Sequence, residues 1–195
     1  MRHDALRDTE ADLMREAGAR NVQLEPTLIP TRGDHLRAQT NRADQSRLDI
    51  AATGIWNAFE RTYFDIRVTH PFAPSNANKD LRQLYQQHER EKKNTYEERV
   101  VENEKGAFCP LVFSTTGGTG GLCDNHHRRI AELIARRRRE RYSDVIAYVR
   151  TRLRFTLLRS VLMALRGTRA KFSKTTKPIS EVSFGLIPAE PTYEI

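Results

Sequence analysis

Two short β-type runs within residues 46–68, SRLDIAATGIWNAFERTYFDIRV, restrict the fold of this chain more than any other segment. The runs RLDIAA and RTYFDIRVTH are separated by TGIWNAFE, in which Gly54 and Asn57 favour a turn, so the segment predicts a β-hairpin. Each predicted strand contains one aspartate, Asp49 in the first and Asp65 in the second. Because aspartate is depleted in strands, two central aspartates on neighbouring strands indicate a function.

Two carboxylates on neighbouring strands converge when the register places them on one face, and they repel unless a cation compensates them. Oxygen ligands with open coordination positions favour magnesium or manganese. We therefore expect Asp49 and Asp65 to bind Mg²⁺ or Mn²⁺. The alternative is that both aspartates are turn or edge residues that face solvent. Glu25 is a further acidic candidate, although an exposed loop position explains it better.

A helical period from about residue 78 to residue 106 supplies a lysine for such a site. One side of this helix consists of Leu81, Leu84, Tyr85, His88, Lys92, Tyr96 and Arg99. Lys92 therefore points inward and is the first candidate to assist an attacking water, with Lys93, roughly 100° further round, as the second. The alternative is that both lysines are solvated, since Glu89 and Lys93 have the spacing of an exposed ion pair. His88 fits a hydrogen-bonded core position better than a ligand.

The remaining apolar patterns complete an α/β arrangement. Residues 3–18 predict an amphipathic helix, the run FCPLVFS predicts a buried strand, and helices are expected at about 124–140 and 143–166. The fold predicted is therefore α/β, with a small mixed sheet flanked by helices. One face of the helix at 143–166 is apolar, so it is either core or a surface for a partner such as a second copy of the chain.

Chain length and composition predict a globular core followed by a basic helical extension and a tail. We expect a core at residues 1–122, a basic helical extension at 123–167 that packs on it, and a tail at 168–195 with little intrinsic order. The N-terminus lacks the apolar region of a secretory signal, and no run of 18 apolar residues occurs. These features, with only two cysteines, predict a soluble intracellular protein with no membrane partner.

The distribution of charge predicts a polyanionic partner. The formal net charge is +8, but residues 128–177 alone hold 13 Arg and 3 Lys against 3 acids. A basic arm of this kind is typical of proteins that bind DNA or RNA through the phosphate backbone. The candidate phosphate contacts are Arg128, Arg129, Arg136, Arg137, Arg138, Arg139 and Arg141. A solvated helix face or a localisation signal is the alternative.

Two other motifs are weaker. The segment CDNHHRR, with Cys109 upstream, has the residue types of a zinc site, but two single cysteines and the adjacent His126 and His127 do not have zinc-knuckle spacing. The segment TTGGTGG lacks the Lys-Ser/Thr of a nucleotide-binding P-loop, so a mobile loop near the cleft is expected there.

The order of these motifs resembles the PD-(D/E)XK restriction-like nucleases, and more closely the C-terminal endonuclease domains of site-specific non-LTR retrotransposons. The matching residues are Arg47 and Asp49 in RLD, Asp65 in FDIRV, and Lys92 and Tyr96 in KKNTY, followed by the strand CPLVFSTTGG. RHDALRD and VQLEP also look like the region before this nuclease in the polyproteins of retroelements that encode reverse transcriptase. The resemblance covers roughly residues 2–167, and the chain looks like a C-terminal portion of such a polyprotein.

The resemblance implies a restriction-endonuclease-like core and a magnesium-dependent hydrolase that nicks DNA, located in the nucleus. Asp49 and Asp65 would be the metal ligands, Lys92 or Lys93 would assist the water, and Tyr96 would pack beside the site or bond into it. Arg47 and Arg67 would contact nucleic acid.

Two departures from the pattern open alternatives. RLD replaces the usual Pro-Asp, and the position of the usual lysine after the second aspartate is Arg67, which cannot lose its proton. Activity then depends on the helix lysine. A catalytically inactive nucleic-acid-binding module and an interaction protein that docks through residues 143–166 are the other two hypotheses.

Overall fold

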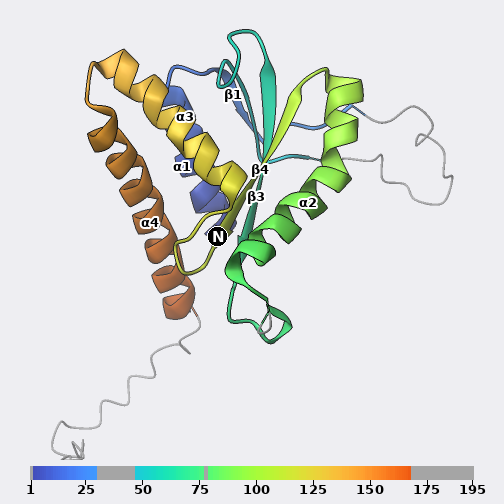
Figure 1. Cartoon of the computed structure of the whole chain (residues 1–195), viewed down its shortest axis with the longest axis vertical. Coiled ribbons are helices and arrows are strands. Elements are labelled where there is room, and N and C mark those ends of the chain that lie inside the picture. The colour runs from blue at the N-terminus through green and yellow to red at the C-terminus, as the bar shows by residue number, and fades with distance from the viewer. Residues whose placement is uncertain (1, 30–46, 77–78, 168–195) are drawn as a thin grey trace, which may run out of the picture.

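Four strands form one mixed sheet with helices on both faces in the computed structural model, which describes residues 2–29, 47–76 and 79–167 (Figure 1). The elements are α1 (Arg2–Glu16), β1 (Arg20–Leu24), β2 (Ile50–Thr53), β3 (Arg61–Thr69), a 3₁₀ turn (Pro74–Asn76), α2 (Leu81–Arg99), a π-helical turn (Val100–Glu104), β4 (Ala107–Ser114), α3 (Gly121–Arg138) and α4 (Tyr142–Gly167). The strand order across the sheet is β1-β2-β3-β4. The predicted α/β class with a small mixed sheet is confirmed.

The central hairpin forms where the sequence predicted it. β2 and β3 are antiparallel, with Ala51 opposite Tyr63 and Thr53 opposite Arg61. Gly54 opens the connection with a φ of +94°, a conformation that a residue without Cβ adopts readily. β1, which pairs antiparallel with β2, was not predicted as a strand. Four of its five residues are exposed, so it lacks the alternation of apolar and polar residues that marks a strand in a sequence.

A crossover through α2 places β4 parallel to β3, with Asp65 opposite Pro110. Proline has no backbone N–H to donate, and β4 is an edge strand of the sheet, where one side needs no partner. Parallel strands require a crossover of this length, and α2 with the π-helical turn supplies it. The crossover lays α2 over β4, on the face of the sheet that carries Asp65, and the Lys92 side chain extends from α2 to that residue.

The larger hydrophobic core lies on the other face of the sheet, under α1, α3 and α4. Phe64 and Leu111 from the sheet are fully buried there with Met14 of α1, Ile130 of α3 and Val149 of α4. Figure 1 shows these three helices on one side of the sheet and α2 on the other. A smaller core under α2 consists of Leu28, Leu48, Ala51, Tyr63, Val100 and Phe108.

The two C-terminal helices belong to the main core. The cluster that contains Phe64 also contains Ile130, Ile134, Val145, Val149, Leu153 and Leu157, so one hydrophobic core extends across the expected boundary at residues 122 and 123. The expected tail at residues 168–195 lies outside the described residues. Within the part of the chain that the structure describes, no helix is both long enough and apolar enough to span a membrane.

Candidate functional site

The two aspartates of the central hairpin meet at the start of β2. Asp65 lies within β3 as expected, but Asp49 lies one residue before β2 rather than inside a strand, which corrects the prediction. The Asp49 backbone N–H donates to the carbonyl of Phe64 (3.0 Å), and the Ile66 N–H donates to Asp49 Oδ2 (2.6 Å). Because that N–H belongs to the peptide that follows Asp65, the two carboxylates are held side by side.

His3 of α1 contacts the Asp49 carboxylate. Its Nε2 lies 3.0 Å from Asp49 Oδ2 and 3.1 Å from the carbonyl oxygen of Ile66. The hydrogen bond to the Asp49 carboxylate raises the pKa of His3 above its usual value, because the carboxylate favours the protonated ring. Sequence reasoning missed His3 as a site residue, since 46 residues separate it from Asp49 and only the packing of α1 joins them.

Lys92 extends from α2 to the second aspartate. Its Nζ lies 2.6 Å from Asp65 Oδ2, and the Asp65 side chain is only 8% exposed. The structure thus places Lys92 inward, as its helical position predicted. Lys93 instead pairs with Glu97 of the next turn at 3.1 Å, on the outer side of α2. Burial raises the pKa of Asp65, and the Asp49 charge adds to this effect, while Lys92 opposes it.

The Tyr96 ring packs beside the Lys92 ammonium group rather than bonding to the carboxylates of Asp49 and Asp65. Lys92 Nζ lies 5.5 Å from the centre of the Tyr96 ring, within the range of a cation–π interaction. The same ring packs on Phe108 of β4, at 5.9 Å between ring centres. Tyr96 therefore supports the position of the Lys92 ammonium group.

His88, one turn before Lys92, is a satisfied core residue, as expected. Its Nε2 lies 3.2 Å from the hydroxyl of Thr69, and its Nδ1 lies 3.3 Å from a Glu91 oxygen. It is 7% exposed, and its partner Thr69 lies four residues after Asp65 on β3. Burial lowers the pKa of His88, so the ring is neutral at physiological pH.

Glu25 neighbours the site through its backbone but faces solvent. Its N–H donates to the carbonyl of Asp49 at 2.9 Å. Its carboxylate, however, pairs with Arg7 on one oxygen and with Arg47 at 3.2 Å on the other. This agrees with the exposed position favoured by the sequence. The ion pair with Glu25 also engages Arg47, which was predicted to contact nucleic acid.

An open cleft of about 580 Å³ lies beside these residues. It is lined by His3, Ile66, Arg67, Val68, His70, Lys92 and Thr115. Thr115 also lines a second cleft of about 630 Å³ that follows the glycine-rich segment to Arg154 of α4. The two clefts share this residue, so they adjoin along one surface from Lys92 to Arg154. Thr115 belongs to the TTGGTGG segment that is expected near the cleft, whereas no sequence pattern points to His70 or Arg154.

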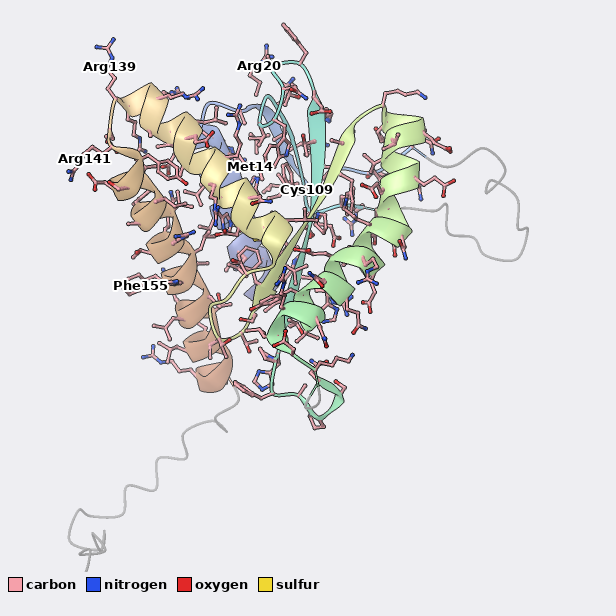
Figure 2. The ribbon with its side chains drawn as sticks, in the orientation of Figure 1. Met14, Arg20, Cys109, Arg139, Arg141 and Phe155 are labelled. Carbon is pink, nitrogen blue, oxygen red and sulfur yellow. The ribbon has the colours of Figure 1, made fainter. Side chains whose placement is uncertain are left out.

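The predicted arginine contacts have different surroundings. Arg67 pairs with Glu91 of α2 at 3.1 Å at the edge of the first cleft. Arg128 pairs with Asp124, Arg138 with Glu16 and Arg141 with Asp144. Figure 2 shows Arg139 and Arg141 pointing outward at the end of the α3–α4 hairpin. Among the described residues, no hydrogen-bond or ion-pair partner is found for Arg136, Arg137 and Arg139.

Arg129 holds the β2–β3 connection through hydrogen bonds to its backbone carbonyls. Its Nε donates to the carbonyl of Ile55 at 2.8 Å and a terminal nitrogen approaches the carbonyl of Trp56, both in the β2–β3 connection. It also pairs with Glu132 at 3.2 Å. Because these groups already occupy most of its donors, Arg129 is a poor phosphate contact compared with Arg136 or Arg137.

The donor set around Asp49 and Asp65 is suited to a hard cation. Magnesium is commonly bound by one or two carboxylates together with water and substrate phosphate oxygens. Lys92 and His3, which contact the two aspartates, line the open cleft, whereas Asp49 and Asp65 lie behind them and are not among its lining residues. The hydrogen bonds to Asp49 and the ion pair to Asp65 both use Oδ2. A cation would therefore bind through Oδ1 of each, or displace Lys92 and His3. The residues present fit magnesium or manganese.

No protein-family model matches this chain, and no curated protein matches it either.

Proposed function

We propose that this protein is a metal-dependent DNA endonuclease with a restriction-endonuclease-like core of retroelement origin. The observation that carries the proposal is Lys92 placed 2.6 Å from Asp65, beside Asp49, at the wall of an open cleft. The hairpin, crossover helix and parallel strand that build this arrangement support the resemblance to restriction-like nucleases. The order of the motifs along the chain supports the same reading.

In the proposed reaction water attacks a backbone phosphorus atom and one P–O bond of the DNA strand breaks. Asp49 and Asp65 would hold Mg²⁺ or Mn²⁺, and the ion would lower the pKa of a bound water and neutralise charge on the phosphate. Lys92 is the only described lysine lining this cleft, and it orients the attacking water or donates to a phosphate oxygen as negative charge grows there. Tyr96 limits the movement of its ammonium group.

Charge along the adjoining clefts supports a nucleic-acid substrate. Arg67 and His70 line the first cleft, and Arg154 lines the second. An extended anionic strand that lies along this surface would pass Lys92 and meet α4. The start of α3 contacts Glu89 of α2, near the first cleft. Because this 18-residue helix is about 27 Å long, the arginines at its end lie far from the first cleft. They would contact backbone distant from the cut. We propose a nuclear location because DNA is the proposed substrate.

The alternative candidate is a nucleic-acid-binding module of the same fold without catalysis. The ion pair between Lys92 and Asp65 supports it, because a lysine that neutralises the aspartate also stabilises the fold without metal. RNA is a second polyanion that such a module would bind through its backbone phosphates.

Plasmid nicking tests the proposal. Purified protein is incubated with supercoiled plasmid and Mg²⁺ or Mn²⁺, alongside Asp65→Asn, Asp49→Asn and an EDTA control. Glu97→Gln is the matched control, since it removes an acid from the outer side of α2. Nicking by wild type and Glu97→Gln alone supports the nuclease. DNA binding without nicking by any form would contradict it and leave the binding module.

A second copy of the chain is proposed as a partner through α4. The exposed large apolar side chains among the described residues of this helix include Phe155, Leu158, Leu162 and Met163. Figure 2 shows Phe155 directed away from the body of the molecule. Sedimentation equilibrium of wild type and Leu158→Glu tests this: a dimer that becomes a monomer supports the pairing, and a wild-type monomer at high concentration rejects it.

A further inference from the structure

We propose that Glu10, Cys123 and His127 form a zinc site between α1 and α3. These residues lie in the larger core, on the face of the sheet opposite α2. They form a group of three potential ligand side chains whose donor atoms all lie within 4.8 Å of one another, and no second such group occurs within the described residues. The site shares no residue with the Asp49, Asp65 and Lys92 cluster, so it is independent of the proposed nuclease.

The distances suit a tetrahedral ion after a small adjustment. Cys123 Sγ lies 3.7 Å from His127 Nε2, and Glu10 Oε1 lies 2.6 Å from the same nitrogen. Ligands at typical zinc distances are separated by roughly 3.3–3.6 Å in a tetrahedron. The sulfur and nitrogen are therefore already near their required separation, and the carboxylate has to withdraw slightly. Cys123 and His127 are four residues apart on α3, so both project from one side of the helix.

Burial makes a cation at this point favourable. Glu10 and Cys123 are 0% exposed and His127 is 2% exposed. An ionised carboxylate in such surroundings is costly unless it is paired or coordinates a metal. Zinc with one carboxylate, one thiolate and a neutral imidazole is a group of zero net charge. The soft thiolate and the imidazole select zinc over magnesium.

A buried polar atom without a partner adjoins the group. His126 Nδ1 has no hydrogen-bond partner among the described residues, although His126 is fully buried. His126 Nε2 lies 3.3 Å from Glu10 Oε2. Buried polar groups without partners are uncommon in native proteins and often mark an ion or a water. His126 is thus placed to donate to Glu10 Oε2, as the outer partner of a metal-bound carboxylate does.

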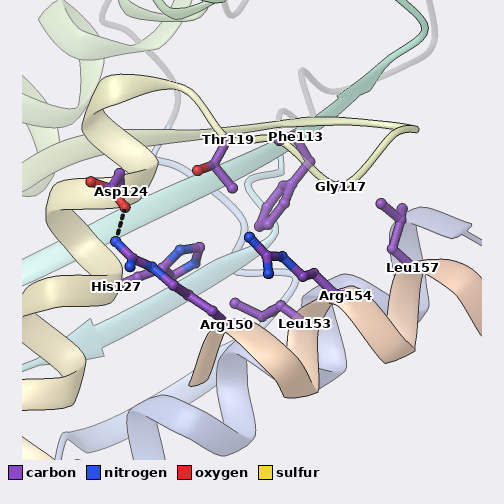
Figure 3. Close-up of a pocket in the computed structure, with 10 residues that line it drawn as sticks. Phe113, Gly117, Thr119, Asp124, His127, Arg150, Leu153, Arg154 and Leu157 are labelled. Atoms are coloured by element: carbon purple, nitrogen blue, oxygen red, sulfur yellow. Dashed lines mark hydrogen bonds and ion pairs between the residues drawn. The ribbon is translucent and has the colours of Figure 1, made fainter. Parts of the chain in front are cut away.

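A cavity gives the site a route for the ion. His127 lines a cavity of about 220 Å³ that lies between the glycine-rich segment and α4 (Figure 3). Arg150 and Asp124 pair at 2.9 Å among its lining residues. An entry path is a requirement for any metal site in a folded protein. A water in this cavity would take the fourth coordination position.

Cobalt titration of the full chain tests the proposal. Protein stripped with chelator is titrated with Co²⁺, whose thiolate complexes absorb in the near ultraviolet and whose tetrahedral complexes absorb strongly in the visible. Zinc then displaces the cobalt. We expect one equivalent, with both bands present in wild type and in Asp65→Asn, because the aspartate site would give neither band.

Cys109 provides the matched control. It is the other buried cysteine of the same core and is no member of the group. The bands should persist in Cys109→Ser, lose their thiolate component in Cys123→Ser, and weaken in His127→Gln, with folding checked by circular dichroism. A folded wild type that shows no thiolate band overturns the proposal, as does a band lost in Cys109→Ser but kept in Cys123→Ser. Glu10 and His127 would then be a buried ion pair that joins α1 to α3.

Discussion

Lys92 Nζ lies 2.6 Å from Asp65 Oδ2, so a lysine of the crossover helix meets an aspartate of β3, the strand beside the one that the helix covers. Neighbouring Lys93 differs, since it pairs with Glu97 on the outside of the same helix. The two lysines therefore form a natural comparison for the proposed activity. Their side chains are chemically identical, and only their direction from α2 distinguishes them.

Lys92→Met should lower plasmid nicking by roughly 10²–10³-fold, the range for loss of one donor to charge that grows in the transition state. Lys93→Met should leave nicking within a few fold, because its ammonium group is directed to Glu97. Initial nicking rates at saturating Mg²⁺ measure both. Equal losses in the two variants would argue against a specific role for Lys92.

His3 should stabilise the fold in a pH-dependent manner. Its folded-state pKa is raised by the bond to Asp49, so its contribution is fully present below the unfolded pKa and disappears as pH rises through the folded value. The decrease in unfolding free energy caused by His3→Gln should therefore be largest at acidic pH and decline above neutrality. Urea unfolding in EDTA at a series of pH values measures it.

His88→Gln is the control for that series, since burial lowers the pKa of His88. A lowered folded-state pKa destabilises the fold as pH falls below the unfolded-state pKa of the ring. The free energy of unfolding of His88→Gln should therefore rise relative to that of wild type in acid. Parallel pH trends for the two variants would contradict the assigned shifts.

Arg129→Ala should destabilise the fold by about 1–3 kcal/mol, because it leaves the carbonyls of Ile55 and Trp56 in the β2–β3 connection without their donor. Arg128→Ala is the matched control. Its partner Asp124 is four residues away on the same helix and its own side chain is 57% exposed, so the change should stay within about 0.5 kcal/mol. Urea midpoints compare the two, and equal losses would show that the connection does not depend on Arg129.

Gly106→Ala should destabilise by about 1–3 kcal/mol, the usual range for overpacking. A Cβ at this position would lie 2.6 Å from the carbonyl oxygen of Arg61, a backbone atom of β3 that cannot move aside. Gly121→Ala, at the start of α3, would meet no atom within 4 Å and should be neutral or stabilising. Thermal unfolding separates them, and a neutral Gly106→Ala would mean that β3 and the π-helical turn can separate.

Replacing Arg136, Arg137 and Arg139 together with alanine should flatten the salt dependence of DNA binding. Each lost phosphate contact lowers the slope of log affinity against log salt by about 0.9. Arg138→Ala should affect stability more than this slope, because Arg138 pairs with Glu16 of α1. Fluorescence anisotropy at several salt concentrations measures the slope. An unchanged slope in the triple variant would remove the end of α3 from the DNA-binding surface.

Local sequence patterns determined most of the secondary structure. The apolar period placed α1, α3 and α4 within a few residues of their observed bounds, because one side of each helix must be buried. The period expected up to residue 106 covers α2, which ends at Arg99, together with the π-helical turn that follows it. The same period distinguished Lys92 from Lys93. The exposed strand β1 escaped detection, and Asp49 was assigned to a strand that begins one residue later.

The partners of these side chains were decided by tertiary structure alone. His3 reaches Asp49 across 46 residues, and Glu10 reaches His127 across 117. The sequence argued against zinc because His126 and His127 are adjacent, whereas the structure turns His127 and Cys123 toward an acid on α1. A periodic pattern specifies which side of a helix is buried, but not which helix it faces. That choice follows from packing all the elements into one core, and it joins residues that are distant in the chain.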